Sequence, residues 1–467
     1  MALGITCLFG QSPPSSPDRP WHGVGEPGLS GEARRAGGPT LVGAPDKICG
    51  LPELIELAEG HNPETRVAWE NARAQAAALG IARSELYPTL SAIALAGIDR
   101  EEIPFGTQFY RQTNPDFQLK LELNYTVFDF GARRGRINAE GAGLLAANLA
   151  FNDVHRQLIY EVSQTYYRLL NAGGQEEAAT ASLSNARAVQ GAAEERLKNG
   201  LATLPDVLEA RSATAQAQYD LQAVLGVEEV ARGQLATALG TSATVTIRVQ
   251  PLSEVPTPEA VPDTVEQAID RALAQRPDLL AHVSAIRSAQ GEREEARAAF
   301  YPSLKIHAGP AAQSLFVLQQ NLPWAHTTDL TGGVSVSLNW TLFDGGARKS
   351  RLTQAEARIR NTEAQLSAAR DEVELQVWTA YSNLRTALRQ REAAVQLATA
   401  ATQSYQAALE SYNYGVRNLL DVTAAQKALA QARSADVLAR TQVLAALSDL
   451  AFRTGDSIQL NRRSPHR

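Results

Sequence analysis

The alternation of apolar and polar residues between Phe117 and Gly131 restricts the possible folds of this chain more than any other feature. Every second side chain is apolar, and the polar residues between them are Gln118, Lys120, Glu122, Asn124 and Thr126. A period of two over such a length predicts a strand with one apolar face and one hydrated face. About 11 residues allow a tilted strand to cross a bilayer, although a half-buried strand of a soluble antiparallel sheet shows the same pattern.

A second copy of this strand occurs 215 positions further along the chain, where the polar positions are Ser335, Ser337, Asn339 and Thr341. Other features recur at almost the same spacing. The Tyr-Pro-x-Leu sequence at Tyr87 returns at Tyr301, and Gly200 returns as Gly415. Self-similarity at a fixed spacing indicates an internal repeat. The chain is therefore predicted to be a tandem duplication, with one extra residue inside the second hairpin.

Composition excludes several classes of protein. The net charge of the 467 residues is −6, which gives no reason to expect a nucleic-acid partner. No run of 18 or more apolar residues occurs, so a membrane-spanning helix is not expected. Both cysteines, Cys7 and Cys49, precede the repeats, and the seven histidines show no spacing typical of metal ligands. We therefore expect no disulfide framework, metal or cofactor.

Residues 1–50 are rich in Gly, Pro, Ser and Arg and show no periodicity, which predicts a disordered segment. The stretch from Ala2 to Phe9 is too short and too interrupted for the apolar core of a signal peptide. A misplaced translation start is our hypothesis for why no export signal is evident.

The first repeat is predicted to cover residues 51–240. Two helices, the second ending at the Tyr-Pro sequence, lead into a β-hairpin at about residues 89–128 and a long helical hairpin at 132–239. The segment from Arg100 to Asn114 holds charges, a proline and a glycine, and is expected to be a solvent-exposed loop.

The stretch from Ala132 to Lys198 contains no proline and has apolar residues at intervals of seven, which predicts one long helix with a coiled-coil seam. A local break is expected at Gly173 and Gly174, because each glycine weakens a helix by about 1 kcal/mol relative to alanine. Asp206 is expected to begin the return helix.

Residues 241–263 contain four prolines and are predicted to link the repeats. The second repeat is predicted to cover residues 264–455, with a β-hairpin at about 303–343 and a long helical hairpin at 347–453, followed by a polar tail at 456–467. Each alternating strand is followed by a Phe-Asp-x-Gly-Ala-Arg junction, in which Asp129 and Asp344 are expected to cap the next helix.

Four strands per chain cannot close a membrane barrel, since the smallest single-chain barrels have about eight. An open strand edge cannot remain in lipid, where each unpaired backbone group costs several kcal/mol. If the strands lie in a membrane, several chains must close the sheet together. We therefore predict an α+β membrane protein, in which long helical hairpins form an α-barrel and each chain contributes four strands to an oligomeric transmembrane β-barrel.

From about Leu51 to Gly455 the chain resembles the TolC-like family of outer-membrane efflux proteins. The resemblance rests on the order and paired spacing of the Tyr-Pro-x-Leu, Phe-Asp-x-Gly-Ala-Arg and Gly-(x)5-Asp motifs. It implies a homotrimer in outer-membrane lipid, with a twelve-stranded barrel and a helical barrel in the periplasm. It also implies a passive exit duct of a tripartite efflux system, with a periplasmic adaptor (membrane fusion) protein and an inner-membrane pump as partners.

Three alternatives remain beside the efflux duct. The exit duct of a type I protein-secretion system would have the same architecture. A soluble coiled-coil scaffold fits the helices but not the alternating hairpins. An enzyme is not expected, because the glycines at Gly131 and at Gly345 to Gly346 lack the Lys-Ser/Thr ending of a phosphate-binding loop and follow strands as hinge residues.

The hydrated faces of the alternating strands are predicted to line a barrel lumen with Lys120, Glu122, Asn124, Ser335, Ser337 and Asn339. Phe128, Trp340 and Phe343 are candidates for an aromatic girdle at one membrane interface.

The two helical tips are the candidate site of a gate. The resemblance implies that Tyr412 and Arg417 tie the second tip to Asp206 of the first, and that Asp421 lies at the constriction. Ala424 replaces a second acidic residue there, so the sequence departs from the family pattern. Asp206 and Asp421 also fit simple N-caps of the return helices. The adaptor is expected to contact Gly200, Leu201, Gly415 and Val416.

Overall fold

The computed structural model describes residues 32, 48–258, 264–320 and 322–456 of the chain. The predicted disorder of residues 1–50 lies mostly outside these ranges. For Ile48 to Gly50 it is wrong, because Cys49 is buried and forms a parallel β-bridge with Val249. Of the predicted polar tail only Asp456 is described, and it forms an ion pair with Arg271 at 2.8 Å.

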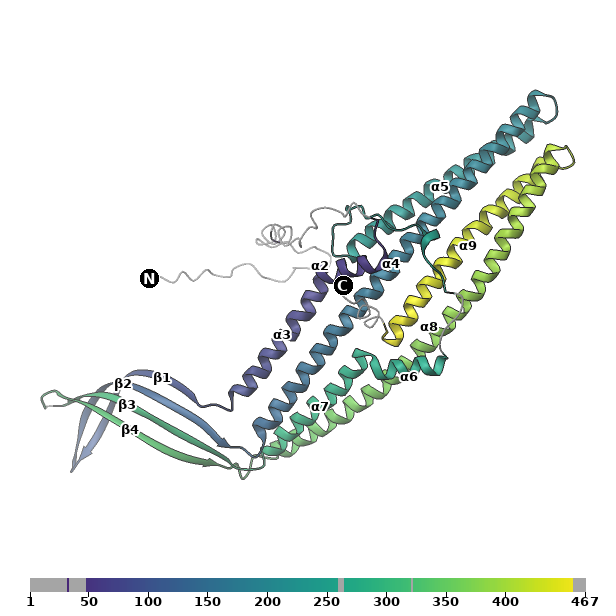
Figure 1. The fold of residues 1–467 in the computed structure, drawn as a ribbon. Coiled ribbons are helices and arrows are strands. Elements are labelled where there is room, and N and C mark those ends of the chain that lie inside the picture. The colour runs from purple at the N-terminus through teal and green to yellow at the C-terminus, as the bar shows by residue number, and fades with distance from the viewer. Residues whose placement is uncertain (1–31, 33–47, 259–263, 321, 457–467) are drawn as a thin grey trace, which may run out of the picture.

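The molecule is elongated, with a sheet at one end and a layer of long helices extending from it (Figure 1). The first half contains α2 (Leu51–His61), α3 (Pro63–Ser84), β1 (Thr89–Phe105), β2 (Gln108–Phe128), α4 (Ala132–Lys198) and α5 (Leu204–Ala238), followed by the short 3-10 helix η1 (Leu252–Glu254). The second half contains α6 (Val265–Gln275), α7 (Pro277–Ala298), β3 (Ser303–Gln319), β4 (Ala325–Asn339), α8 (Ala347–Asn413) and α9 (Leu419–Thr454). Both halves therefore have the same order of main helices and strands.

The four strands form one antiparallel sheet in the order β1-β2-β3-β4. Thr89 pairs with Asn124 in the first hairpin, and Ser303 pairs with Asn339 in the second. These pairs occupy equivalent positions of the repeat. The two hairpins therefore have the same register, as expected when one face of each strand has a fixed environment.

The first hairpin is longer than predicted. The expected loop from Arg100 to Asn114 is wrong, because β1 and β2 remain paired down to the turn at residues 106–107. Polar side chains join the strands in this part, and Arg100 Nε donates to Thr113 Oγ1 at 3.2 Å. Pro104 lies on β1, an edge strand of this sheet, where proline is tolerated.

Helices α4 and α8 have 67 residues each and extend from the sheet to the far end of the molecule (Figure 1). Near the sheet the helices lie side by side in the order α3, α4, α7, α8; further away the order is α5, α4, α9, α8. Helices α3, α5 and α8 thus form the edges of the layer. Within the described ranges, no helix combines the length and the hydropathy needed to cross a membrane.

The predicted break in α4 is wrong, since the helix is continuous through Gly173 and Gly174. Gly174 lies where α4 packs against α9 and η1. A Cβ on it would lie 2.7 Å from Cγ1 of Val437 and 3.3 Å from Cδ2 of Leu252. A Cβ on Gly173 would meet nothing within 4 Å. Tertiary packing therefore requires the second glycine and offsets its low helix propensity.

A central core forms where the middle of α4 packs against α2, the end of α5 and the segment between the repeats. Its buried side chains include Leu158, Val162, Tyr166, Leu235 and Leu239. Ile247 of the predicted linker is only 3% exposed. This part of the linker is therefore packed against the helices. A second core near the tips joins the two helical hairpins.

Equivalent hydrogen bonds join the start of each repeat to the end of its last helix. Asn62 Nδ2 donates to the Ala238 carbonyl at 3.2 Å, and Arg276 donates to the Arg453 carbonyl at 3.4 Å. Arg276 is 4% exposed and forms an ion pair with Asp278 at 2.6 Å. Burial acts to raise the pKa of Asp278, but the hydrogen bond from Arg276 and its charge outweigh burial and hold the pKa below its usual range.

The contrast between the adjacent glycines of α4 can be tested with matched substitutions. Gly174→Ala should lower the free energy of unfolding by about 1–3 kcal/mol, because the new methyl group collides with Val437. Gly173→Ala should raise it by up to about 1 kcal/mol, because alanine favours the helix and meets open space. Thermal unfolding in detergent, followed by circular dichroism, measures both; equal effects would contradict the packing role of Gly174.

Candidate functional site

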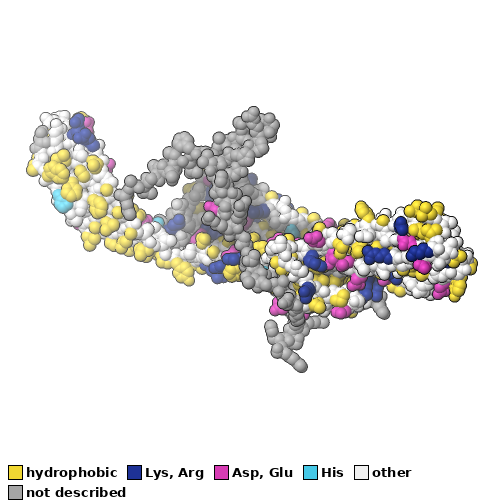
Figure 2. Space-filling view, turned by 90° about the horizontal axis from the view of Figure 1, so that it is seen from above, with side chains coloured by type: hydrophobic (Ala, Val, Ile, Leu, Met, Phe, Trp, Pro, Cys, Tyr) yellow, Lys and Arg dark blue, Asp and Glu magenta, His cyan; other side chains and the backbone are white. Residues whose placement is uncertain are grey.

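On β2, apolar side chains are more exposed than their polar neighbours, which is the reverse of the pattern in a soluble protein. Leu119 and Leu121 are 50% and 45% exposed, whereas Lys120 and Glu122 between them are half-buried. On β4, the apolar residues Val334, Val336 and Leu338 are also exposed. Patches of hydrophobic side chains lie over the sheet, at the left of the space-filling view (Figure 2). The outward face of the sheet therefore suits contact with lipid rather than water.

The opposite face carries a polar network that includes four of the predicted lumen residues: Lys120, Glu122, Asn124 and Ser337. Lys120 pairs with Glu122 at 3.4 Å, and Asn124 Nδ2 donates to Glu122 Oε1 at 3.1 Å. His307 of β3 contacts the Asn124 side chain and lies 3.1 Å from Ser337 Oγ. His307 was not among the predicted lumen residues, because no local pattern in the sequence sets it apart from the other histidines. Only the pairing of β3 with β2 and β4 brings it into the network.

The other two predicted lumen residues lie on β4. Ser335 is opposite His307 in the ladder, and Asn339 is opposite Ser303 at the strand end. Both therefore share the polar face of the sheet.

Each strand-to-helix junction is held by its aspartate. Asp129 accepts hydrogen bonds from the backbone N–H of Gly131 (3.2 Å) and Arg133 (3.0 Å), and from Arg133 Nε (2.8 Å). Asp344 makes the same three contacts in the second repeat. The capping predicted for both aspartates is confirmed. Gly131 has a left-handed backbone (φ 97°), which explains the glycine as a turn residue rather than part of a phosphate site.

The two helical tips lie side by side at the end opposite the sheet (Figure 1). Gly200 and Gly415 are left-handed, with φ of 71° and 76°, and close the two turns. Leu201 and Val416, which follow them, are 67% and 79% exposed. The tips therefore present apolar side chains to a partner.

The caps of the return helices lie three residues earlier than predicted. Asp206 is in the first turn of α5 and accepts hydrogen bonds from Thr203 N (2.9 Å) and Thr203 Oγ1 (2.7 Å). These bonds lower the pKa of Asp206. In α9 the cap is Asn418, whose Oδ1 accepts from Asp421 N at 3.0 Å. The N-cap role predicted for both aspartates is therefore wrong, and the Asp421 carboxylate is exposed.

Arg196 joins the tips of one chain. Its guanidinium donates to the carbonyls of Tyr412 (2.8 Å) and Asn413 (3.2 Å) and lies 4.6 Å from the centre of the Tyr412 ring. Tyr412 is 4% exposed, and burial raises the pKa of its hydroxyl. Among the described residues, Arg417 forms no ion pair with Asp206. The sequence analysis missed Arg196, which has no counterpart in the second repeat, where the equivalent residue is Ser411.

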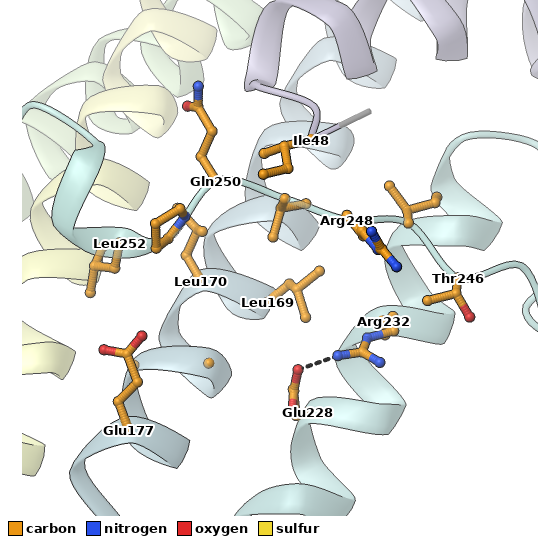
Figure 3. A pocket seen from close by; sticks show the side chains of 15 residues that line it. Ile48, Leu169, Leu170, Glu177, Glu228, Arg232, Thr246, Arg248, Gln250 and Leu252 are labelled. Atoms are coloured by element: carbon orange, nitrogen blue, oxygen red, sulfur yellow. Dashed lines mark hydrogen bonds and ion pairs between the residues drawn. The ribbon is translucent and has the colours of Figure 1, made fainter. Parts of the chain in front are cut away.

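A cavity of about 400 Å³ lies away from both sites, between α4, α5 and residues 246–252 (Figure 3). Its floor is apolar, with Leu169 and Leu170, and Glu228 at its rim pairs with Arg232. Nowhere in the described part of the chain do three or more His, Cys, Asp or Glu residues form a group suited to a metal ion.

Known proteins match most of the chain. The outer membrane efflux protein family matches residues 54–241 and 268–456. Protein CyaE of Bordetella pertussis is 31% identical over 410 residues, which cover 85% of this chain and 83% of that protein. Outer membrane protein OprJ of Pseudomonas aeruginosa is 25% identical, with coverage of 86% and 82%. The crystal structure of a membrane protein from Pseudomonas aeruginosa has a TM-score of 0.76 at 25% identity, covering 87% of this chain and 93% of that chain.

The chain belongs to the outer membrane efflux protein family. It is an outer-membrane channel protein that acts as an exit duct in efflux, and its long helices lie in the periplasm. The predicted family, fold class and location are confirmed. The family consists of channel proteins. The left-handed backbone at Gly131, Gly345 and Gly346 explains these glycines as turn residues, so they need no phosphate-binding role.

The two faces of β2 predict losses of stability of different size for the same substitution. Leu121→Arg places a charge against lipid and should lower the stability of the assembled protein by about 2–4 kcal/mol near the bilayer centre. Glu122→Arg should cost less than Leu121→Arg, about 1–2 kcal/mol, because the side chain stays on the polar face and loses one ion pair, with Lys120, and one hydrogen bond, from Asn124. Membrane insertion and heat-resistant oligomer on gels measure the difference; equal defects would contradict the assignment of faces.

The Arg196 contacts predict how firmly the tips of one chain are joined. Arg196→Met should make the tip amides exchange hydrogen about 5–30-fold faster, since about 1–2 kcal/mol of hydrogen bonding is lost. Lys198→Gln is the control, because Lys198 makes only an exposed ion pair, with Glu195 at 3.7 Å. Hydrogen exchange measured by mass spectrometry compares the variants, and unchanged exchange in Arg196→Met would assign the joint to other residues.

Proposed function

We propose that three copies of this chain form a closed duct through the outer membrane and periplasm. The duct conducts substrates passively from an inner-membrane pump and a periplasmic adaptor to the exterior. The observation that carries this proposal is a sheet with an exposed apolar face, a polar inner face and two open edges. Such a sheet is stable in lipid only when further copies pair with its edges.

The helical layer supports the same closure, because its edge helices expose apolar side chains that no neighbour in the chain covers. These residues include Val67 and Ile81 on α3, Tyr219 and Val230 on α5, and Leu375, Trp378 and Leu397 on α8. In a ring, the α8 edge of one copy packs against the α3 and α5 edge of the next. A heterologous contact of this kind closes into a ring.

The internal repeat supplies the register of the strand pair between copies. Asn124 of β2 pairs with His307 of β3, which joins the first repeat to the second. The equivalent positions are Asn339 of β4 and Ile93 of β1. We therefore place Asn339 opposite Ile93 of the neighbouring copy.

Cysteine pairs test this register in a variant whose two native cysteines are replaced by alanine. Asn339→Cys with Ile93→Cys should form intermolecular disulfides on mild oxidation, because directly opposite Cβ atoms lie about 4.5–5.5 Å apart. Denaturing gels should then show covalent species up to the trimer. Asn339→Cys with Ala92→Cys is the control, since a slip of one residue turns the second cysteine to the other face. Equal cross-linking of both pairs would contradict the register, and a larger covalent ring would contradict the trimer.

We place the gate at the tips, where Asp206, Tyr412, Arg417 and Asp421 lie near the duct axis of the trimer. Arg417 makes no ion pair with a described residue of its own chain, which leaves it free to reach Asp206 of a neighbour. The adaptor contacts Gly200, Leu201, Gly415 and Val416 on the exposed ends of the tips. Lys120, Glu122, Asn124, Ser335, Ser337 and Asn339 line the barrel lumen.

Removal of the gate contacts should open the duct. Asp206→Ala combined with Arg417→Ala should raise the single-channel conductance in planar bilayers, because the pair that holds the tips closed is removed. An exposed ion pair contributes only about 0–1 kcal/mol per copy, so the closed state is only weakly favoured. The trimer should remain intact, since neither residue lies in a buried core. Unchanged conductance of intact trimers would place the closing contacts elsewhere.

A further inference from the structure

Helices α4 and α8, which follow the sheet, differ from the other described helices in the charge of their first turns. Six of the described α-helices carry an acidic residue in the first turn: α2, α3, α5, α6, α7 and α9. The first turns of α4 and α8 carry none. Their first residues are instead basic: Arg133, Arg134 and Arg136 in α4, and Arg348, Lys349 and Arg351 in α8. Cations at a helix N-terminus oppose the helix dipole. These residues therefore do not stabilise their own helices by charge.

Half of these basic residues have partners inside the chain. Arg133 and Arg348 bind the aspartates of their junctions, and Arg136 pairs with one glutamate after α3 and another on α7. The remaining three are exposed and make no ion pair or side-chain hydrogen bond with any residue that the structure describes: Arg134, Lys349 and Arg351. Arg351 is the repeat equivalent of Arg136 and lies on the α8 edge that packs against the next copy in the proposed ring. Arg134 and Lys349 are therefore the two cations of this region that neither the described chain nor the ring pairs.

Exposed aromatic side chains lie at the same level of the molecule. They flank the strand ends in both repeats: Tyr87, Phe128, Phe130, Tyr301, Trp340 and Phe343. Phe343 is 87% exposed, which water alone does not favour. Aromatic residues of membrane barrels gather at the level of the lipid headgroups. Arg134 and Lys349 lie in the first turns of α4 and α8, directly after these aromatic residues in each repeat. Cations in these turns are therefore placed for the headgroup layer, which is roughly 5–8 Å deep on each side of a bilayer.

We propose that Arg134 and Lys349, which occupy equivalent positions of the repeat, form a basic collar that binds the phosphate groups of anionic phospholipids in the periplasmic leaflet. The inference rests on the proposed duct, which places the sheet in the bilayer and the helices in the periplasm. The collar is continuous with the apolar face of the sheet. A lipid can therefore lay its chains on the strands while its phosphate meets the cations, which a soluble anion cannot do.

The lipid preference of the full-length trimer tests the collar. Wild-type protein in detergent should retain phosphatidylglycerol over phosphatidylethanolamine in native mass spectrometry. Neutralising the collar with Arg134→Gln and Lys349→Gln should lower phosphatidylglycerol affinity by about fivefold per residue. Binding to the wild type should also weaken as salt approaches about 1 M, where screening shortens to about 3 Å.

Two exposed basic residues further along the same helices provide the control: Arg187→Gln and Arg385→Gln. This variant should keep the wild-type preference. Equal loss in both variants, or no preference in the wild type, would overturn the collar. Competition by glycerol phosphate as strong as that by the lipid would show a soluble-anion site and would also overturn it. Cross-linking and conductance test the duct separately. If the protein forms the cross-linked trimer and conducts but does not discriminate between the lipids, only the collar is refuted.

Discussion

A strand edge cannot stay unpaired in lipid, and the rest of this structure depends on that constraint. The bilayer core offers no water to the free N–H and C=O groups of β1 and β4. The sheet of one chain is too narrow to close on itself, so its edges require other copies. The helices that continue from the strands are then held in a ring as well, and their exposed apolar edges become interfaces between copies.

The strand-to-helix junction converts a ring of strands into a ring of helices. Asp129 fixes the first turn of α4 through its hydrogen bonds to Gly131 and Arg133, and Asp344 does the same for α8. The residue before the capping glycine is left-handed in both repeats, with φ of 51° at Phe130 and 68° at Gly345. Phe130 takes this unfavourable conformation while its ring stacks on Tyr301 at 4.9 Å. Aromatic packing here stabilises a left-handed backbone conformation, which Gly345 adopts without strain in the other repeat.

The duplication makes the contact between the two repeats a template for the contact between copies in the proposed trimer. The contact of the first repeat with the second is present inside the chain, in the β2–β3 pair and in the packing of α4 on α7 and α9. The contact between copies joins equivalent elements, although its residues differ. Gly135 and Gly291 let α4 and α7 approach closely, since a Cβ on either would lie 2.6 Å from the backbone of the other helix. The equivalent residues between copies are Ser350 and Ala77, which require a wider spacing of the helices.

Sequence alone determined the repeat, the strand faces, the helix order and the family. Each of these is written in local patterns: a period of two, a heptad seam, proline and glycine boundaries, and a fixed spacing between copies. It also identified the tips and most of the polar residues on the inner face of the sheet. The bounds of α4 agree with the sequence because a glycine turn precedes this helix and another follows it.

Only the tertiary structure decided the features that depend on partners distant in the sequence. The segment from Arg100 to Asn114 has the composition of a loop, but pairing across the hairpin makes it strand. Gly174 reads as a helix breaker until Val437 and Leu252 occupy the space of its missing side chain. His307 enters the polar network through the pairing of three strands, and Arg196 reaches the second tip because the two helical hairpins pack side by side. In each case the deciding contact joins residues far apart in the chain, and no local pattern records it.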